Sequence, residues 1–334
     1  MGLLLVLLTL LGTGTSLKVG LLHMHGLTGH FDSEKNLKFK EFVESHTDVE
    51  VHLIDAFNYG ESITSLTYQV PIILEQVKEI AAEYDKVIAV GHSQGGIIWR
   101  GMIEKWEYHN VDTFITLASP QHGVANIPSE VLDKFVESKI ESEGLKSIVM
   151  EMLGNIRGIF SLEFLLEIFK QVILILGHEE ESDELIESIF NLAPANYYLD
   201  STNHTLYLEN INFFPELNNE KGSDQEKETQ KKNFLGLRKL VMIGGPQDGF
   251  LVPWQSAIFG YFDENGYAGQ NVLNMTETTF YKEDLFGLKT LAERGGVEKH
   301  VVENVDHFQF GYNRRIMETI VLPVLKEVTE NVAN

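Results

Sequence analysis

The sequence predicts an α/β protein with a mostly parallel central sheet and helices on both of its faces. Three observations lead to this prediction. Short β-rich runs alternate with helical patterns along the chain. One of these runs ends in a tight glycine-serine-glycine turn and is followed by helical spacing. The 334 residues, 43% of them hydrophobic, are enough for one large α/β domain with an insertion or for two modest domains.

The expected strands are spread over the whole chain, and each ends in a loop rich in polar or small residues. A helical pattern, "PIILEQVKEIAAEY", lies between the second and third of them. Residues 218–233 are interpreted as a solvated loop or a frayed helix, because they are strongly polar. The strand-like runs are "LKVGLLHMHG", "VEVHLIDAF", "KVIAVG", "TFITLAS" (Thr113–Ser119), "KLVMIGG" (Lys239–Gly245) and "EKHVVEN" (Glu298–Asn304).

The N-terminal residues 1–16 are predicted to be a cleaved signal peptide. An apolar run from Leu3 to Leu11 gives way to small residues there, and it is far shorter than the ~20 residues that cross a bilayer. A buried first strand is the alternative interpretation. Residues 17–334 would then form one catalytic domain in the secretory route. In that case the Asn203-His204-Thr205 and Asn274-Met275-Thr276 triplets are candidate glycosylation sites.

The charge of the chain argues against polyanionic partners. Its 26 Lys and Arg face 49 Asp and Glu, which leaves a formal net charge of -23. Such a chain repels a phosphate backbone or an anionic bilayer surface over a Debye length. We therefore expect no nucleic-acid partner. No transmembrane segment is expected either, because the apolar run at Leu3 to Leu11 is too short to span a bilayer. The chain has no cysteine, so its stability does not depend on disulfides.

The Gly91-His92-Ser93-Gln94-Gly95 segment places a serine where an apolar strand turns into a helix. This is the pattern of a nucleophile elbow, in which a strained turn exposes the serine hydroxyl above the sheet. The glycines allow the helix to approach the neighbouring strands. Ser93 is the predicted nucleophile. The backbone N–H of Gln94, at the helix N-terminus, is one predicted donor of an oxyanion hole.

A serine nucleophile needs a histidine base, and the base needs a carboxylate that holds its tautomer. In a fold with such an elbow, the acid follows the nucleophile and precedes the histidine in the chain. Asp248 follows the strand-like run Lys239–Gly245 by a few residues and is the predicted acid. Asp263 is interpreted as a turn residue, and Asp112 precedes a strand instead of following one.

His307 is the predicted base, because it lies just past the last strand-like run. His300 lies within that run, and His122 comes too early in the chain. His92 adjoins the nucleophile on a sharp turn and should point elsewhere. The second oxyanion donor is expected in the loop after the first strand, where the backbone N–H of Leu27 is the natural partner of Gln94.

Several blocks of the chain resemble the palmitoyl-protein thioesterases. The resemblance covers most of the chain and includes the sequences of several loops as well as that of the elbow. It implies an α/β-hydrolase fold, a Ser93-Asp248-His307 triad, lysosomal residence and hydrolysis of long-chain acyl thioesters. The blocks are "YDKVIAVGHSQGGIIWRGMIE", "VDTFITLASPQHGV", "LVMIGGPQDGFLVPWQSAIFGYFD", "LFGLKTLAERGGV" and "VDHFQF".

An inserted helical cap is predicted over residues of about 124–235, where hydrolases of this fold carry insertions. Its part from about residue 127 to 191 belongs to none of the blocks that carry the resemblance. That part contains "SEVLDKFVESKI" and the apolar "IFSLEFLLEIFKQVILILG". The cap either packs on the body as an amphipathic helical layer or also lines an acyl groove.

The predicted function is that of a lysosomal or secreted serine hydrolase of long-chain acyl thioesters, working without metal or cofactor through an acyl-enzyme. An oxygen-ester lipase or carboxylesterase shares every catalytic step and is the first alternative. A non-catalytic lipid-binding hydrolase fold is the second. The sequence leaves open whether the substrate is an acyl-protein, an acyl-peptide or acyl-CoA, the preferred acyl length, and the oligomeric state.

Overall fold

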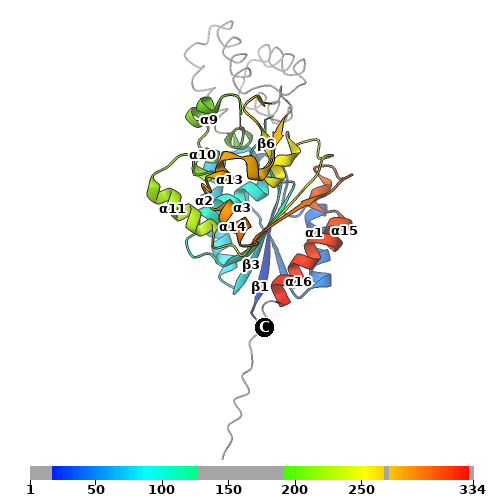
Figure 1. The fold of residues 1–334 in the computed structure, drawn as a ribbon. Coiled ribbons are helices and arrows are strands. Elements are labelled where there is room, and N and C mark those ends of the chain that lie inside the picture. Colours follow the sequence, from blue (N-terminus) through cyan, green and yellow to red (C-terminus); the bar gives the residue numbers. More distant parts are fainter. Residues whose placement is uncertain (1–16, 126–191, 200, 267–270, 331–334) are drawn as a thin grey trace, which may run out of the picture.

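A six-stranded, entirely parallel sheet forms the centre of the molecule, with the strand order β2-β1-β3-β4-β5-β8. The computed structural model describes residues 17–125, 192–199, 201–266 and 271–330 (Figure 1). The predicted α/β class and parallel sheet are confirmed. The strands are β1 (Val19–Met24), β2 (Glu50–Leu53), β3 (Lys86–His92), β4 (Val111–Leu117), β5 (Lys239–Gly244) and β8 (Val297–Val301).

Helices cover both faces of this sheet (Figure 1). One face carries α2 (Leu66–Ala81), α3 (Gln94–Lys105) and α11 (Asp224–Phe234). The other carries α1 (Glu34–His46), α15 (Arg314–Ile316), the π-helical turn η6 (Met317–Val321) and α16 (Leu322–Glu330). The remaining elements are η1 (Tyr59–Ile63), α8 (Ala193–Asn196), α9 (His204–Asn210), α10 (Phe213–Leu217), η3 (Trp254–Ile258), β6 (Tyr261–Phe262), β7 (Val272–Leu273), η4 (Met275–Glu277), α13 (Thr279–Lys282), α14 (Leu288–Glu293) and η5 (Gln309–Gly311).

Continuous apolar runs form the central strands because both faces of the sheet are covered. Successive side chains point to opposite faces, so Leu22 and Val87 join the core under α2 and α3. Leu21 and Ile88 join the core under α1 and α16. All four side chains are fully buried. The run of β-branched and apolar residues therefore supplies two cores at once.

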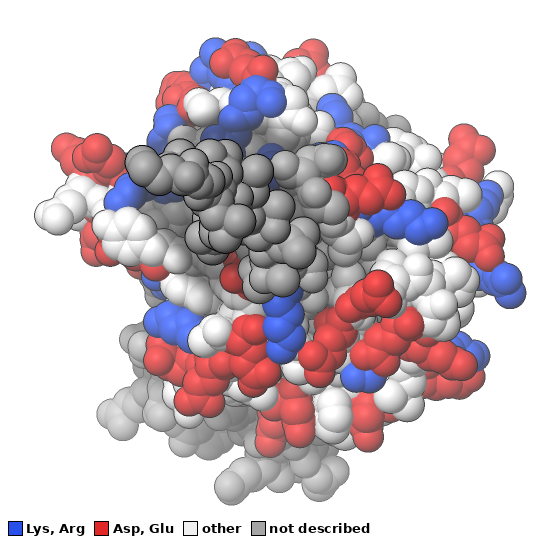
Figure 2. All heavy atoms as spheres, turned by 90° about the horizontal axis from the view of Figure 1, so that it is seen from below, with Lys and Arg blue, Asp and Glu red and all other residues white. Residues whose placement is uncertain are grey.

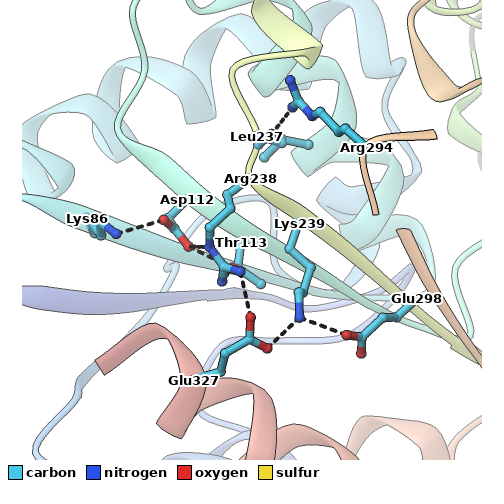
Figure 3. Close-up of polar contacts among 9 residues, drawn as sticks. All are labelled: Lys86, Asp112, Thr113, Leu237, Arg238, Lys239, Arg294, Glu298 and Glu327. Atoms are coloured by element: carbon cyan, nitrogen blue, oxygen red, sulfur yellow. Dashed lines mark hydrogen bonds and ion pairs between the residues drawn. The ribbon is translucent and has the colours of Figure 1, made fainter. Parts of the chain in front are cut away.

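An ion-pair network links the N-terminal ends of three strands, at the end of the sheet opposite the serine turn (Figure 3). The Nε atom of Arg238 lies 2.9 Å from Asp112 Oδ2, and its Nη1 lies 2.8 Å from Glu327 Oε1. Lys239 pairs with Glu327 and, at 2.7 Å, with Glu298. The network joins β4, β5 and β8 to α16. Its carboxylates are thus committed to a structural role.

Figure 2 shows the face of the molecule at this N-terminal end of the strands. Carboxylate side chains are spread over most of the visible surface, with lysines and arginines between them. The basic side chains drawn there do not gather into a continuous patch, which agrees with the net charge of -23.

Most of the polar stretch at residues 218–233 forms a solvent-exposed helix, so the helical alternative is confirmed there, although the helix is regular and not frayed. Helix α11 begins with a capping box, in which the Ser223 hydroxyl accepts the Glu226 N–H and the Glu226 carboxylate accepts the Ser223 N–H. Its C-terminal Phe234 is buried against the body. A polar sequence folds here because its cap and one buried aromatic anchor it.

The predicted insertion is only partly described. Its last helices, α10 and α11, pack against α3. The predicted signal peptide at 1–16 and the apolar stretch within 127–191, including Phe164 and Phe169, lie outside the described residues. Within the described part of the chain, none of the helices is long and apolar enough to cross a membrane.

Candidate active site

Ser93 occupies a strained turn between β3 and α3. Its backbone has φ 54° and ψ -127°, a conformation that costs a non-glycine residue free energy and is found at nucleophile elbows. Gly95 makes the turn possible, since a Cβ atom there would lie 2.4 Å from the carbonyl oxygens of both Met24 and His25. Close approach of α3 to β1 therefore requires glycine at this position.

Three side chains from separate loops meet at this turn. His307 Nε2 lies 2.9 Å from Ser93 Oγ, and His307 Nδ1 lies 2.8 and 3.0 Å from the two carboxylate oxygens of Asp248. All three residues are buried, with exposed fractions of 7% or less. Because a carboxylate only accepts, Nδ1 carries the proton and Nε2 is free to accept the serine proton. Such a chain of hydrogen bonds can activate a serine hydroxyl for nucleophilic attack.

The loop after β5 holds the Asp248 carboxylate in place. Its Oδ1 accepts the backbone N–H groups of Phe250, at 3.0 Å, and Leu251, at 2.7 Å. The His307 N–H donates to the Asp248 carbonyl oxygen at 3.1 Å, so the two loops are also joined through their main chains. The Phe250 ring stacks on the His307 imidazole, 4.7 Å away and 18° from parallel. The Asp248 carboxylate, the main-chain hydrogen bond and the Phe250 ring together fix the position of the imidazole.

The segments that carry the two predicted oxyanion donors both lie next to the serine: Gln94 follows it in the chain, and a Cβ atom at Gly26, the neighbour of Leu27, would lie 2.9 Å from Ser93 Cβ. Gln94 is the first residue of α3, where backbone N–H groups have no partner in a preceding turn. Leu27 lines the same pocket as Ser93. Ser62 holds both segments: its hydroxyl accepts the Thr28 N–H at 2.7 Å, and its carbonyl oxygen accepts from Gln94 Nε2 at 2.8 Å.

Ser93 and His307 open into a cavity of about 700 Å³. The loop after β1 forms one wall, the first turn of α1 forms a second, and the loops that carry Phe250 and Phe308 form a third. This volume is in the range of small-molecule sites. The cavity gives a substrate access to the serine hydroxyl.

His92, which was expected to point elsewhere, lines the cavity without joining the chain of hydrogen bonds to the serine. Its Nε2 lies 2.9 Å from the carbonyl oxygen of His307. Burial, followed by the nearby His307, lowers the pKa of His92 to about 3. Sequence reasoning missed the aromatic wall of Phe250 and Phe308, because no spacing rule links them to the elbow.

The histidines and aspartates that the sequence argument set aside lie elsewhere. Asp112 belongs to the ion-pair network at the opposite end of the sheet. The Asp263 carboxylate accepts from the Asn265 N–H and from Asn271 Nδ2 in its own turn. His300 is part of β8, and His122 is buried with its Nδ1 3.2 Å from the Phe259 carbonyl oxygen.

The two glycosylation triplets sit at the starts of short helices. Asn274 is exposed and caps η4, where its Nδ2 donates to Glu277 Oε2 at 2.9 Å. Asn203 is partly exposed, directly before α9. No group of three or more metal-ligating side chains is placed to hold an ion among the residues that the structure describes.

The parallel sheet of this order, covered by helices on both faces and carrying a serine at a strained strand-to-helix turn, defines the chain as an α/β hydrolase. Its sequence matches the family model described as palmitoyl protein thioesterase over residues 20–307. The chain therefore belongs to the palmitoyl protein thioesterase family.

Similar proteins occur in animals. A Xenopus laevis protein named lysosomal thioesterase PPT2-B is 31% identical over 95% of this chain and 95% of its own length. The Homo sapiens protein named lysosomal thioesterase PPT2 is 32% identical over 90% of this chain and 86% of its own length. The solved structure of the carboxylesterase CesB (YbfK) from Bacillus subtilis aligns with a TM-score of 0.44 at 12% identity, covering 92% of this chain and 84% of that one.

Proposed function

We propose that this chain hydrolyses long-chain acyl thioesters, with Ser93 as nucleophile, His307 as base and Asp248 as the acid that orients it. The observation that carries the proposal is the 2.9 Å separation of His307 Nε2 from Ser93 Oγ, with Asp248 behind the imidazole. Membership in the palmitoyl protein thioesterase family supports the thioester as the bond that is cleaved.

The reaction proceeds in two halves. His307 Nε2 takes the Ser93 proton while the serine oxygen attacks the thioester carbonyl carbon, and the carbonyl oxygen becomes an oxyanion held by the N–H groups of Leu27 and Gln94. His307 then returns its proton to the leaving sulfur as the carbon–sulfur bond breaks. Water, deprotonated by the same imidazole, hydrolyses the acyl-serine ester and releases the fatty acid.

The surrounding chain supports each role. The carboxylate of Asp248 holds the proton of His307 on Nδ1 and stabilises the imidazolium that forms during attack. The strain at Ser93 keeps the hydroxyl above the end of the sheet. No step needs a metal or a cofactor.

We further propose that residues 1–16 are a signal peptide, that residues 17–334 form the catalytic domain, and that the insertion of about 124–235 is its cap. The protein would then act in the lysosome or outside the cell, with glycans on Asn203 and Asn274. The relatives named as lysosomal thioesterases support this route. Treating secreted protein with a glycosidase, and then repeating this with Asn203→Gln and Asn274→Gln, tests the two sites one at a time.

The deciding experiment compares thioester and oxygen-ester substrates that share one acyl group and one carrier skeleton. S-palmitoyl-N-acetylcysteamine and its oxygen analogue form such a pair. We expect the thioester to have the higher kcat/KM. Faster turnover of the oxygen ester would instead identify a lipase or carboxylesterase. Absence of labelling by a fluorophosphonate probe, which reacts with activated serines, would identify a lipid-binding protein without catalysis.

A further inference from the structure

Lys35, in the first turn of α1, is a cation in the wall of the active-site cavity. It is exposed, and no carboxylate of the described chain lies within ion-pair distance of its ammonium group. Its neighbours on the same rim are already paired. Glu34 pairs with Lys38 at 2.6 Å, and Asp32 pairs with His30 at 2.8 Å. In a chain with a net charge of -23, this leaves an uncompensated positive charge in the wall of the cavity that also contains Ser93.

The ammonium group of Lys35 is placed by an aromatic ring. Its Nζ lies 5.0 Å from the centroid of the Phe308 ring, within the range of a cation–π interaction. Phe308 follows His307 directly, and the two rings meet edge to face at 5.6 Å. With 56% of its surface exposed, Phe308 offers its remaining face to the cavity and to solvent.

The direction in which the leaving group departs links this pair to the reaction. His307 Nε2 must reach the leaving sulfur to return a proton to it, so the thiol carrier lies on the His307 side of the cavity. On that side the Phe308 ring contacts the His307 ring, and Lys35 contacts the Phe308 ring in turn. The field of Lys35 reaches the cavity floor, since its charge is one of the causes that lower the pKa of His92, after burial, His307 and His23.

We propose that Lys35 and Phe308 form a subsite for the thiol carrier that selects carriers bearing an anionic group. Lys35 contacts the phosphate or carboxylate of the carrier, and Phe308 supports its arm. The inference rests on the proposed function and adds to it the chemistry of the leaving group. Phosphate and carboxylate carriers satisfy the same subsite and are separated by experiment.

The test compares three palmitoyl thioesters that differ only in carrier: coenzyme A, which bears phosphates, glutathione, which bears carboxylates, and neutral N-acetylcysteamine. Lys35→Gln should lower kcat/KM about three- to fivefold on at least one anionic carrier, mainly through KM, and leave the neutral carrier unchanged. Lys35→Glu should lower kcat/KM on that anionic carrier about tenfold, and Lys35→Arg should keep it near the value of the unaltered enzyme. Added salt should reduce the ratio of kcat/KM on the anionic carrier to kcat/KM on the neutral carrier for the unaltered enzyme.

Lys78→Gln is the matched control. Lys78 is a partly exposed lysine on α2 that pairs with Glu75, and it does not line the cavity. Its loss removes the same charge and should change none of the three activities. Equal losses on all three carriers with Lys35→Gln, or no loss on any, would overturn the subsite.

A binding measurement separates this proposal from the proposed function. Titration of coenzyme A, glutathione and N-acetylcysteamine into the Ser93→Ala protein needs no turnover. At least one anionic thiol should bind more weakly once Lys35→Gln is added, and the neutral thiol should not respond. Inactivity of the unaltered enzyme on every thioester, with this difference present, would contradict the proposed reaction and leave the subsite supported. Absence of the difference would overturn the subsite alone.

Discussion

The Nε2 atom of His92 lies 2.9 Å from the main-chain carbonyl oxygen of His307. A carbonyl oxygen only accepts, so His92 is the donor and its proton is on Nε2. With its pKa lowered to about 3 by burial, His92 stays neutral throughout the range in which a histidine base works. The residue before the nucleophile therefore holds the backbone of the proposed base.

His92→Phe should lower kcat about tenfold to a hundredfold, because the loop of His307 loses its tie to β3 and a shift of about 1 Å disturbs the proton transfer. His92→Gln, whose amide can donate to the same carbonyl oxygen, should recover most of the rate. Steady-state kinetics on a palmitoyl thioester, combined with thermal melts, separates the effects. A lower melting temperature with unchanged kcat would assign His92 a structural role only.

Gly95→Ala should reduce kcat by about a hundredfold with a smaller effect on the free energy of unfolding. The added Cβ would lie 2.4 Å from the carbonyl oxygens of Met24 and His25, so α3 must move away from the end of β1. That movement separates the two proposed oxyanion donors, whose individual loss costs about 10²–10³ in rate. Kinetics and urea unfolding measure the two effects. Normal kcat in this variant would contradict the close approach.

Stability should fall as pH drops below neutrality, partly because of His23. The ring of His23 is buried, neither nitrogen has a hydrogen-bond partner among the described residues, and burial lowers its pKa to about 3. In the unfolded chain His23 binds a proton as the pH falls below about 6.5, whereas in the folded chain it stays neutral down to about pH 3. The free energy of unfolding therefore falls as the pH drops from about 6.5 to 3. At pH 5 the loss is about 2 kcal/mol.

His23→Leu should therefore flatten the pH dependence. Leucine fits the apolar surroundings next to Phe39, whose ring lies 4.8 Å from that of His23. The gain in unfolding free energy over the unaltered chain should be larger at pH 5 than at pH 7.5 by about 2 kcal/mol. Urea unfolding at the two pH values gives this difference. Equal gains at both would show that His23 does not titrate on unfolding.

The length of the acyl chain should control kcat/KM. Each buried methylene contributes about 0.8 kcal/mol, which corresponds to about fourfold in rate. On one carrier, kcat/KM should rise from acetyl toward palmitoyl and fall once the chain outgrows its groove, by less than the full sum because of ordering costs. A flat profile would show that no groove shelters the acyl chain. Phe164 and Phe169, outside the described residues, are the candidates for polar substitution.

The sheet could be predicted from the sequence because parallel strands that are buried on both faces consist of continuous runs of apolar residues. Every predicted strand occurs, within a few residues of its expected ends. That the side chains of Ser93, Asp248 and His307 meet could be predicted, because the fold fixes their order and their positions after particular strands. Helix α11 was not predicted as a regular helix, since its polar sequence hides the capping box and the buried Phe234 that stabilise it.

Contacts across the molecule could not be predicted from local pattern. His92 was expected to point away from the site, and the fold turns its ring onto the backbone of His307 instead. The buried Arg100 gives another example. It pairs with Glu104 at 2.8 Å and donates to the carbonyl oxygens of Gln121 and Leu217, on either side of the segment at 126–191. The pair with Glu104 follows helical spacing, but the contacts of Arg100 with Gln121 and Leu217 have no spacing signal in the sequence.

Turnover of a palmitoyl thioester by the Ser93→Ala, His307→Ala and doubly substituted proteins tests the central claim most directly. If the two residues act as one unit, each single variant should lose several orders of magnitude in kcat while remaining folded. The double variant should then be little worse than either. A folded Ser93→Ala protein that keeps more than a small fraction of the kcat, or losses that multiply in the double variant, would contradict a Ser93 nucleophile activated by His307.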